Sequence, residues 1–276
     1  MILNATMRRM GVLTLAVCLL AACSGDKDKD KFVEKPVDEL YNNAVKEMEE
    51  ADYKQSAKTF EEVERQYPYS QWATKAQLMA AYAQYQGQDF DSAVATLDRF
   101  IQLHPGNPEI AYAYYLRALS YYERIADVAR DQSFTREAEK ALQDVVTRFP
   151  GTPYARDAVL KQSLVQDQLA GAEMEVGRYY LKQRIFSAAL TRFQNVVEKY
   201  QTTSHAPEAL HRMVECYAAL GIKPEAQAAA AVLGHNFPGS RWYEASYALL
   251  GGENLAPAAN KGSWIGRVWR GVTGSR

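Results

Sequence analysis

A pattern that recurs five times constrains this chain more than any other feature of its sequence. A small residue is followed four positions later by an apolar residue and, eight positions after that, usually by proline. The five occurrences are Ser56–Phe60–Pro68, Ala93–Leu97–Pro105, Ala138–Leu142–Pro150, Ala189–Phe193–Gln201 and Ala226–Ala230–Pro238. Self-similarity of this kind is typical of solenoids. The sequence therefore predicts an all-α fold, a right-handed α-solenoid of five tetratricopeptide-like helix pairs.

Each position of the pattern has a mechanical reason. A small residue lets two antiparallel helices approach closely, and the apolar residue four positions later lies on the same helical face. Proline ends the second helix because it lacks an N–H and clashes with the preceding turn. The residue before that stop is always aromatic or imidazole, and we expect it to fill the gap between adjacent pairs. These residues are Tyr67, His104, Phe149, Tyr200 and Phe237.

The spacing of the pattern predicts where the first helix of each pair begins. The expected starts are Val37, Thr74, Ala111, Ala170 and Pro207. The third interval is longer than the others, and we assign the excess to a loop around 125–133 and an extra helix around 155–169. The solenoid is thus expected over residues 37–250, with N-terminal repeats in 37–150 and C-terminal repeats in 151–250.

The first residues have the layout of a lipoprotein signal peptide, expected over residues 1–22. Arg8 and Arg9 precede an apolar run of about 13 residues, whereas spanning a bilayer takes about 20. The sequence LAAC at 20–23 resembles the lipobox of bacterial lipoproteins, which predicts covalent diacylglycerol and an N-acyl chain on Cys23. Residues 23–36 then form a lipidated flexible tether. The alternative is an ordinary signal peptide with an incidental cysteine.

Cysteine use and net charge limit the disulfides that the chain can form and the partners that it can bind. With Cys18 removed and Cys23 lipidated, Cys216 has no partner for an intramolecular disulfide, and we expect it to be a buried structural thiol. Without Arg8 and Arg9 the chain carries 30 basic and 33 acidic residues. This weak acidity argues against nucleic acid as a partner, because nucleic-acid binding needs a basic face.

Motifs for catalysis or for a cofactor were not found in the sequence. The glycine pairs lack the strand-turn-helix context of a phosphate loop. His205 and His211 are six residues apart, which places them on different helix faces, and no carboxylate pattern completes a metal site. We therefore expect neither a metal nor another cofactor, and we expect that the protein is not an enzyme; a periplasmic enzyme is the contrasting alternative.

The inward faces of the first helices carry the candidate residues for binding a partner or peptide. Tyrosine offers a large contact area and a hydroxyl at low entropic cost, which suits peptide recognition. The alternative is that these tyrosines pack between helices. The candidates are Tyr41, Tyr82, Tyr85, Tyr112, Tyr115, Tyr122 and Arg178.

Residues 251–276 form a basic, aromatic tail. Trp264, Ile265, Val268 and Trp269 share one helical face, while Arg267 and Arg270 lie elsewhere. Such a segment suits an anionic bilayer or the groove of a partner. Several glycines weaken helix formation, so a disordered tail is the alternative.

The chain resembles the BamD family, the tetratricopeptide-repeat lipoproteins of the outer-membrane β-barrel assembly machinery. The resemblance covers residues 39 to about 250, beside the lipobox. It is carried by ELYNNA at 39–44, RQYPYS at 65–70, DRFIQLHP at 98–105, the Arg130–Asp131 pair in the long third unit, and VGRYY at 176–180. Gln201, in place of proline, departs from the pattern and predicts a different turn, and the resemblance does not extend to the tail.

The resemblance implies a non-catalytic scaffold that is lipid-anchored at the periplasmic face of the outer membrane. Ser24, directly after the cysteine, also favours sorting of the lipoprotein to the outer membrane. The implied partners are the POTRA domains of the barrel subunit BamA, contacted mostly by the C-terminal repeats, and other lipoproteins of the assembly complex. The N-terminal repeats would bind unfolded outer-membrane proteins through their aromatic C-terminal strand. A pilotin-like or peptidoglycan-associated tetratricopeptide lipoprotein scaffold is the alternative.

Overall fold

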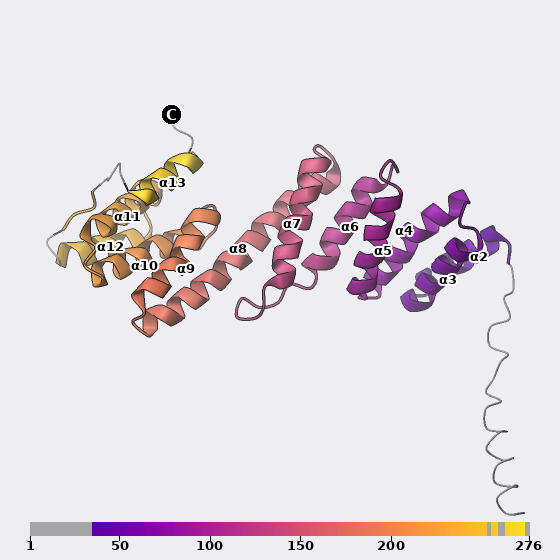
Figure 1. The fold of residues 1–276 in the computed structure, drawn as a ribbon, viewed down its shortest axis with the longest axis horizontal. Coiled ribbons are helices and arrows are strands. Elements are labelled where there is room, and N and C mark those ends of the chain that lie inside the picture. The colour runs from indigo at the N-terminus through magenta and orange to yellow at the C-terminus, as the bar shows by residue number, and fades with distance from the viewer. Residues whose placement is uncertain (1–34, 253–254, 259–262, 274–276) are drawn as a thin grey trace, which may run out of the picture.

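The described part of the chain is a stack of helix pairs. A computed structural model describes residues 35–252, 255–258 and 263–273, and these residues contain helices and no strand. The pairs follow one another along the long axis of the molecule, from the indigo N-terminal end to the yellow C-terminal end (Figure 1). The expected fold class, an α-solenoid of tetratricopeptide-like pairs, is confirmed.

Five pairs and two further helices make up this stack. The pairs are α2 (Val37–Glu49) with α3 (Tyr53–Gln66), α4 (Gln71–Gln86) with α5 (Phe90–Leu103), α6 (Ile110–Tyr122) with α7 (Ser133–Arg148), α8 (Pro153–Lys182) with α9 (Phe186–Lys199), and α10 (Ala206–Ala219) with α11 (Lys223–Asn236). The helices α12 (Arg241–Gly252) and α13 (Trp264–Thr273) follow them. α4 begins three residues before the expected Thr74, because the Ser70 hydroxyl caps it at the N–H of Ala73.

The predicted repeat pattern is confirmed by burial. Its five small residues are all fully buried, and so are the apolar residues four positions later. Each aromatic or imidazole residue that precedes the stop is the C-cap of a second helix. Tyr200 has φ −129° and ψ 41°, close to the −128° and 53° of Tyr67. The expectation of a different turn at Gln201 is therefore wrong, since the helix ends the same way without proline.

Four of the five pairs share one tight turn between their helices. The residue five positions before each small residue has a positive φ: 62° at Ala51, 59° at Gln88, 61° at Arg184 and 74° at Gly221. The next N–H then bonds back across the helix end, as from Asp52 to the Glu47 carbonyl at 2.9 Å. This is the Schellman arrangement, which satisfies the last carbonyls of a helix. In the third pair, residues 123–132 form a loop instead, close to its expected position.

The helix α8 corrects one expectation. An extra helix around 155–169 and a separate first helix from Ala170 were expected, but the structure has one continuous helix of 30 residues. Nothing after Pro153 removes a backbone donor, and both ends of the helix find packing partners. Its N-terminal part packs on α7 and its C-terminal part on α9. α8 therefore joins the two halves of the solenoid (Figure 1).

The tail also differs from expectation. Residues 264–273 form α13, which packs on α11. Ile265 is fully buried, the Trp264 indole N–H donates to the Tyr217 hydroxyl at 3.0 Å, and Trp269 meets Phe237 edge-on at 6.0 Å between ring centroids. A disordered or membrane-lying tail is thus wrong for 264–269. The end of a solenoid exposes an apolar groove that has to be covered, and here the tail covers it.

Two observations bear on the membrane and on the thiol. Among the described residues, no helix has the length and apolar character needed to cross a bilayer. The expected signal peptide, Cys23 and the tether up to residue 34 lie outside the described residues. Cys216 is buried as expected, and burial raises the pKa of its thiol to about 12.

Candidate functional site

The first helices of the pairs line the inner side of the stack. Neighbouring first helices contact one another, α2 with α4, α4 with α6 and α6 with α8, and the neighbouring second helices of the described chain show no contact of this extent. Five predicted tyrosines lie on two of these helices, Tyr82 and Tyr85 on α4 and three on α6. Together with Tyr154 on α8 they form what we call the tyrosine band: Tyr82, Tyr85, Tyr112, Tyr115, Tyr122 and Tyr154.

Contacts between rings and carboxylates join the tyrosine band across three helices. The Tyr154 ring lies 5.6 Å from that of Tyr112 and 5.3 Å from that of Tyr115, between centroids. The Tyr115 hydroxyl donates to Asp157 Oδ2 at 2.5 Å, and that of Tyr85 reaches Glu123 Oε1 at 3.4 Å. All six rings are half-buried, so each keeps part of its surface free for a ligand.

The chemistry of the tyrosine band combines aromatic faces with mixed charges. Burial, followed by the charge of Glu123, raises the pKa of Tyr85 to about 12. Burial and the hydrogen bond to Asp157 raise the pKa of Tyr115 as well. The phenols of Tyr85 and Tyr115 therefore stay neutral at physiological pH and keep the protons that they donate to these carboxylates. A cation is also present, because the Lys161 ammonium lies 5.0 Å above the Tyr122 ring.

Tyr154 was missed by reasoning from the sequence, and Tyr41 was wrongly included. Tyr154 lies in the segment assigned to an extra helix, for which the repeat gave no inward positions. Tyr41 is 6% exposed, with its ring 5.2 Å from Phe60 and 4.8 Å from Trp72. It is a core residue of the first pair and is not available to a partner.

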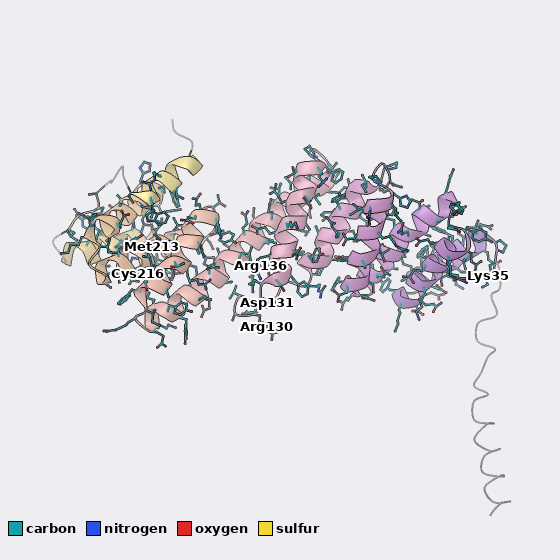
Figure 2. All side chains as sticks on the ribbon, viewed as in Figure 1. Lys35, Arg130, Asp131, Arg136, Met213 and Cys216 are labelled. Atoms are coloured by element: carbon teal, nitrogen blue, oxygen red, sulfur yellow. The ribbon has the colours of Figure 1, made fainter. Side chains whose placement is uncertain are left out.

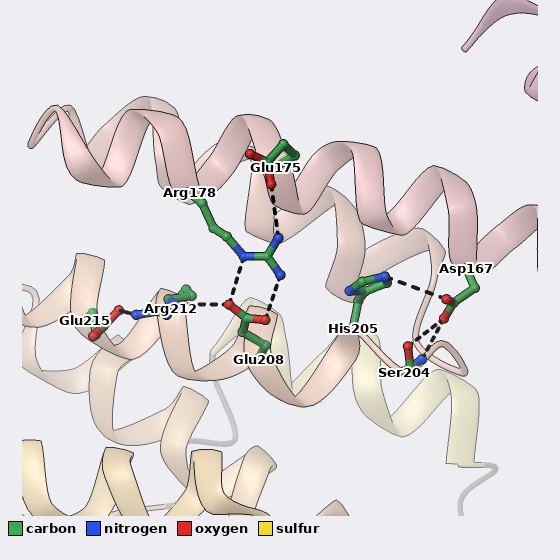
Figure 3. Close-up of polar contacts among 8 residues, drawn as sticks. All are labelled: Asp167, Glu175, Arg178, Ser204, His205, Glu208, Arg212 and Glu215. Atoms are coloured by element: carbon green, nitrogen blue, oxygen red, sulfur yellow. Dashed lines mark hydrogen bonds and ion pairs between the residues drawn. The ribbon is translucent and has the colours of Figure 1, made fainter. Parts of the chain in front are cut away.

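Arg178 also has a different role from the one expected. Its Nε and Nη2 bind the two oxygens of Glu208 at 3.0 and 2.8 Å, and its Nη1 lies 3.4 Å from Glu175 (Figure 3). Arg212 reaches Glu208 from the next turn, at 3.4 Å, and binds Glu215 at 2.8 Å. The guanidinium of Arg178 is thus occupied within the chain, where it ties α8 to α10.

We predict that Arg178→Met weakens this connection. Burial works to raise the pKa of Glu208, but Arg178 and Arg212 outweigh it and hold that pKa below its ordinary value. The free energy of unfolding of the variant should be lower by about 1–2 kcal/mol near neutral pH. This value lies between the cost of breaking an exposed ion pair and that of breaking a buried one. A carboxylate whose pKa is lower in the folded protein stabilises the fold at pH values above its unfolded pKa of about 4.3. That stabilisation is lost as the pH falls through the folded pKa.

Urea unfolding at neutral pH and below pH 4 measures both effects. The difference between Arg178→Met and the unmodified protein should shrink in acid. Lys46→Met is the control, because its pair with Glu50 is 3.8 Å apart and both side chains are more than half exposed. A loss at Arg178 no larger than at Lys46 would show that the pair contributes nothing.

A second surface lies where the third-pair loop meets α8. Arg130, Asp131 and Arg136 come together at this junction (Figure 2). With α8 they line what we call the junction hollow, which has a volume of about 450 Å³. Tyr179 and Val176 on its α8 side are 60% and 39% exposed. The hollow therefore offers guanidinium groups beside uncovered apolar surface.

Metal-ligating and nucleophilic side chains are scattered over the described residues. No three His, Cys, Asp or Glu side chains gather there as a metal site would need. His211 Nδ1 lies 2.8 Å from Ser246 Oγ and its Nε2 lies 3.4 Å from Glu215 Oε1. Ser246 is fully buried and Trp242 covers the imidazole, with ring centroids 5.3 Å apart. A substrate cannot reach this serine, so the cluster serves to fasten α12 to α10.

Fold and surfaces together define a helical-repeat protein with exposed aromatic and charged faces. A family model described as YfiO, outer membrane lipoprotein, matches residues 33–233, and the chain belongs to this family. It is 48% identical to the outer membrane protein assembly factor BamD of Caulobacter vibrioides, over 89% of this chain and 83% of that protein. It is 43% identical to BamD of Rickettsia prowazekii, over 87% and 96%. The expected family is confirmed.

Similarity to solved structures is more distant. The TPR2AB-domain:pHSP90 complex of yeast Sti1 superposes with a TM-score of 0.43. Sequence identity is 11%, over 79% of this chain and 86% of that one. A similarity of this size carries no information about the partner.

Proposed function

We propose that this protein is an outer-membrane protein assembly factor that acts as a scaffold without catalysis. It would be held at the periplasmic face of the outer membrane by lipid on Cys23. Its relatives are named for assembly of outer membrane proteins. The observation that carries the proposal is the tyrosine band, an uncovered aromatic surface that runs over α4, α6 and α8 in a chain of this family.

The tyrosine band would bind unfolded outer-membrane proteins through an extended, aromatic-rich segment. An unpaired strand exposes backbone N–H and C=O groups along its edges. Glu123 and Asp157 can accept from such N–H groups with their remaining lone pairs, and so can the phenol oxygens of Tyr85 and Tyr115, whose protons already bond to these carboxylates. Ring pairs of about 5–6 Å are the geometry in which aromatic side chains attract one another, so the same rings suit aromatic residues of the segment.

The C-terminal half would contact the POTRA domains of the barrel subunit and other lipoproteins of the complex. The junction hollow lies where this half begins and supports such a contact, because Arg130 and Arg136 of the third pair offer charge beside the exposed Tyr179 and Val176 of α8. Interfaces favour exposed aromatic and arginine side chains over lysine and glutamate. In this arrangement α8 connects the surface for the substrate with the surface for the partner.

A binding measurement tests the substrate role. A synthetic peptide of the C-terminal strand of an outer-membrane barrel protein is titrated against the folded protein. Tyr85→Ala combined with Tyr115→Phe should weaken binding by about tenfold, or about 1.4 kcal/mol, since the first change removes an aromatic contact and the second removes the hydroxyl that holds Asp157 in place. Tyr247→Ala, at a 57% exposed tyrosine of α12, is the control and should leave binding unchanged.

Equal affinity for the double variant and the control would refute the tyrosine band as the substrate site. A detergent pull-down of the full chain addresses the partner role separately. The POTRA-bearing barrel subunit should copurify with it, whereas recovery of a secretin instead would support the pilotin-like alternative.

A further inference from the structure

The turn between α3 and α4 exposes aromatic surface, the whole of Tyr69 and the part of Trp72 that does not pack against Tyr41. Tyr69 is fully exposed and Trp72 is 37% exposed. The Lys75 ammonium lies 5.9 Å from the centre of the Trp72 ring. We call these three residues the aromatic turn. Tyrosine and tryptophan with an apolar body and a polar tip are the residues that concentrate at membrane interfaces.

The aromatic turn is held in place by its own hydrogen bonds. The Ser70 hydroxyl donates to the Tyr67 carbonyl at 2.8 Å and accepts from the Ala73 N–H at 3.1 Å. The Ser70 N–H bonds to the same carbonyl at 3.0 Å. The exposure of Tyr69 is thus a fixed feature of the surface. The ring projects from an ordered backbone, so binding has to fix only the rotamer of its side chain.

The N-terminal segment enters the fold beside this turn. The Tyr67 hydroxyl donates to the carbonyl of Lys35 at 2.6 Å, so the start of the described chain is tied two residues from Tyr69. Cys23 precedes Lys35 by 12 residues. Twelve residues reach at most about 40 Å, whatever conformation they adopt. A lipid on Cys23 would keep the aromatic turn close to the bilayer at all times.

We propose that the aromatic turn is a lipid-contact site, in which Tyr69 and Trp72 insert among phospholipid headgroups and Lys75 binds their phosphates. This inference rests on the proposed lipid anchor. An anchor raises the effective concentration of a second, tethered contact into the millimolar range. Two aromatic side chains and one ammonium are too weak to bind a membrane alone, but they suffice for contact once the anchor holds them near it.

This contact would orient the whole solenoid. α2, α3 and α4 form one end of the stack, and α12 and α13 lie at the other (Figure 1). With the aromatic turn on the bilayer, the α4 end of the tyrosine band lies near the membrane. The junction hollow and the C-terminal pairs then reach towards the periplasm, where the domains of a partner would be.

Fluorescence quenching in vesicles tests the inference. The lipidated full chain carrying Gln71→Cys is labelled with a polarity-sensitive dye and reconstituted into phosphatidylethanolamine–phosphatidylglycerol vesicles that contain headgroup-nitroxide lipid. Cys216 stays unlabelled because it is fully buried. Label on Tyr247→Cys, at the far end, is the matched control. We expect quenching several-fold stronger at 71 than at 247, and lower quenching at 71 when Tyr69→Ser is added.

Tyr69→Ser leaves the core untouched, since Tyr69 is fully exposed, whereas Trp72 also contacts Tyr41 at 4.8 Å. Protein that floats with vesicles but is quenched equally at 71 and 247 overturns the lipid contact and leaves the anchor standing. Protein that does not float overturns both. Shielding of the label at 71 only after a denatured outer-membrane protein is added would assign the aromatic turn to protein binding and also overturn the inference.

Discussion

Gly177→Val should destabilise the middle of the solenoid by about 1–3 kcal/mol through overpacking. A Cβ at residue 177 would lie well inside the van der Waals radius of the Phe193 ring. Phe193 is fully buried on α9 and cannot move aside. A side chain in place of glycine would favour the helix by a few tenths of a kcal/mol, which is too little to offset the clash. Hydrogen exchange should rise mainly in α8 and α9, because solenoid repeats interact only with their neighbours.

The control for this variant is Gly106→Val, at a turn glycine where an added Cβ meets nothing within 4 Å. It should change the unfolding midpoint little. Phe193→Leu added to Gly177→Val should recover part of the loss by freeing space, and a double-mutant cycle measures that coupling. If Gly177→Val unfolded at the same urea concentration as the unmodified protein, the close approach of α8 and α9 would not exist.

Cys23→Ser should move the protein almost completely from membranes to the soluble periplasmic fraction. The proposed lipid carries two or three chains, and stable anchoring needs two membrane signals. The aromatic turn alone is too small to replace them. Membrane fractionation after export measures the distribution, and mass spectrometry of the N-terminal peptide reports whether the lipid is present.

Two other cysteine variants serve as controls for Cys23→Ser. Cys18→Ser alters the expected signal peptide outside the lipobox, and Cys216→Ser alters a buried thiol. Neither should change the amount bound to membranes. Unchanged membrane binding of Cys23→Ser would contradict the lipid anchor.

The repeat could be located from the sequence because its signal is local. Ala93 and its four equivalents, together with the aromatic C-caps such as His104, follow a rule of helix packing and helix ending that operates within about twelve residues. The turns at Ala51, Gln88 and Arg184 were harder to foresee. Their residues are not glycine, and their positive φ results from the helices on both sides.

The candidate site could be predicted only in part. The inward face of α4 and α6 follows from helical periodicity, which is why Tyr82, Tyr85 and Tyr115 were found. Whether a side chain on that face is free depends on its neighbours from other pairs. Tyr41 is enclosed by Phe60 and Trp72, and Arg178 is occupied by Glu208, 30 residues further along the chain.

The sequence by itself determined the helix pairs, their order, the ends of their second helices and the family, because each depends on contacts within one repeat or on residues read one at a time. Only the tertiary structure decided that α8 is continuous, that α13 covers the last pair, and which aromatic residues remain exposed. Those outcomes depend on apolar surface buried between segments distant in the chain. Such burial cannot be predicted from residues that are neighbours in the sequence.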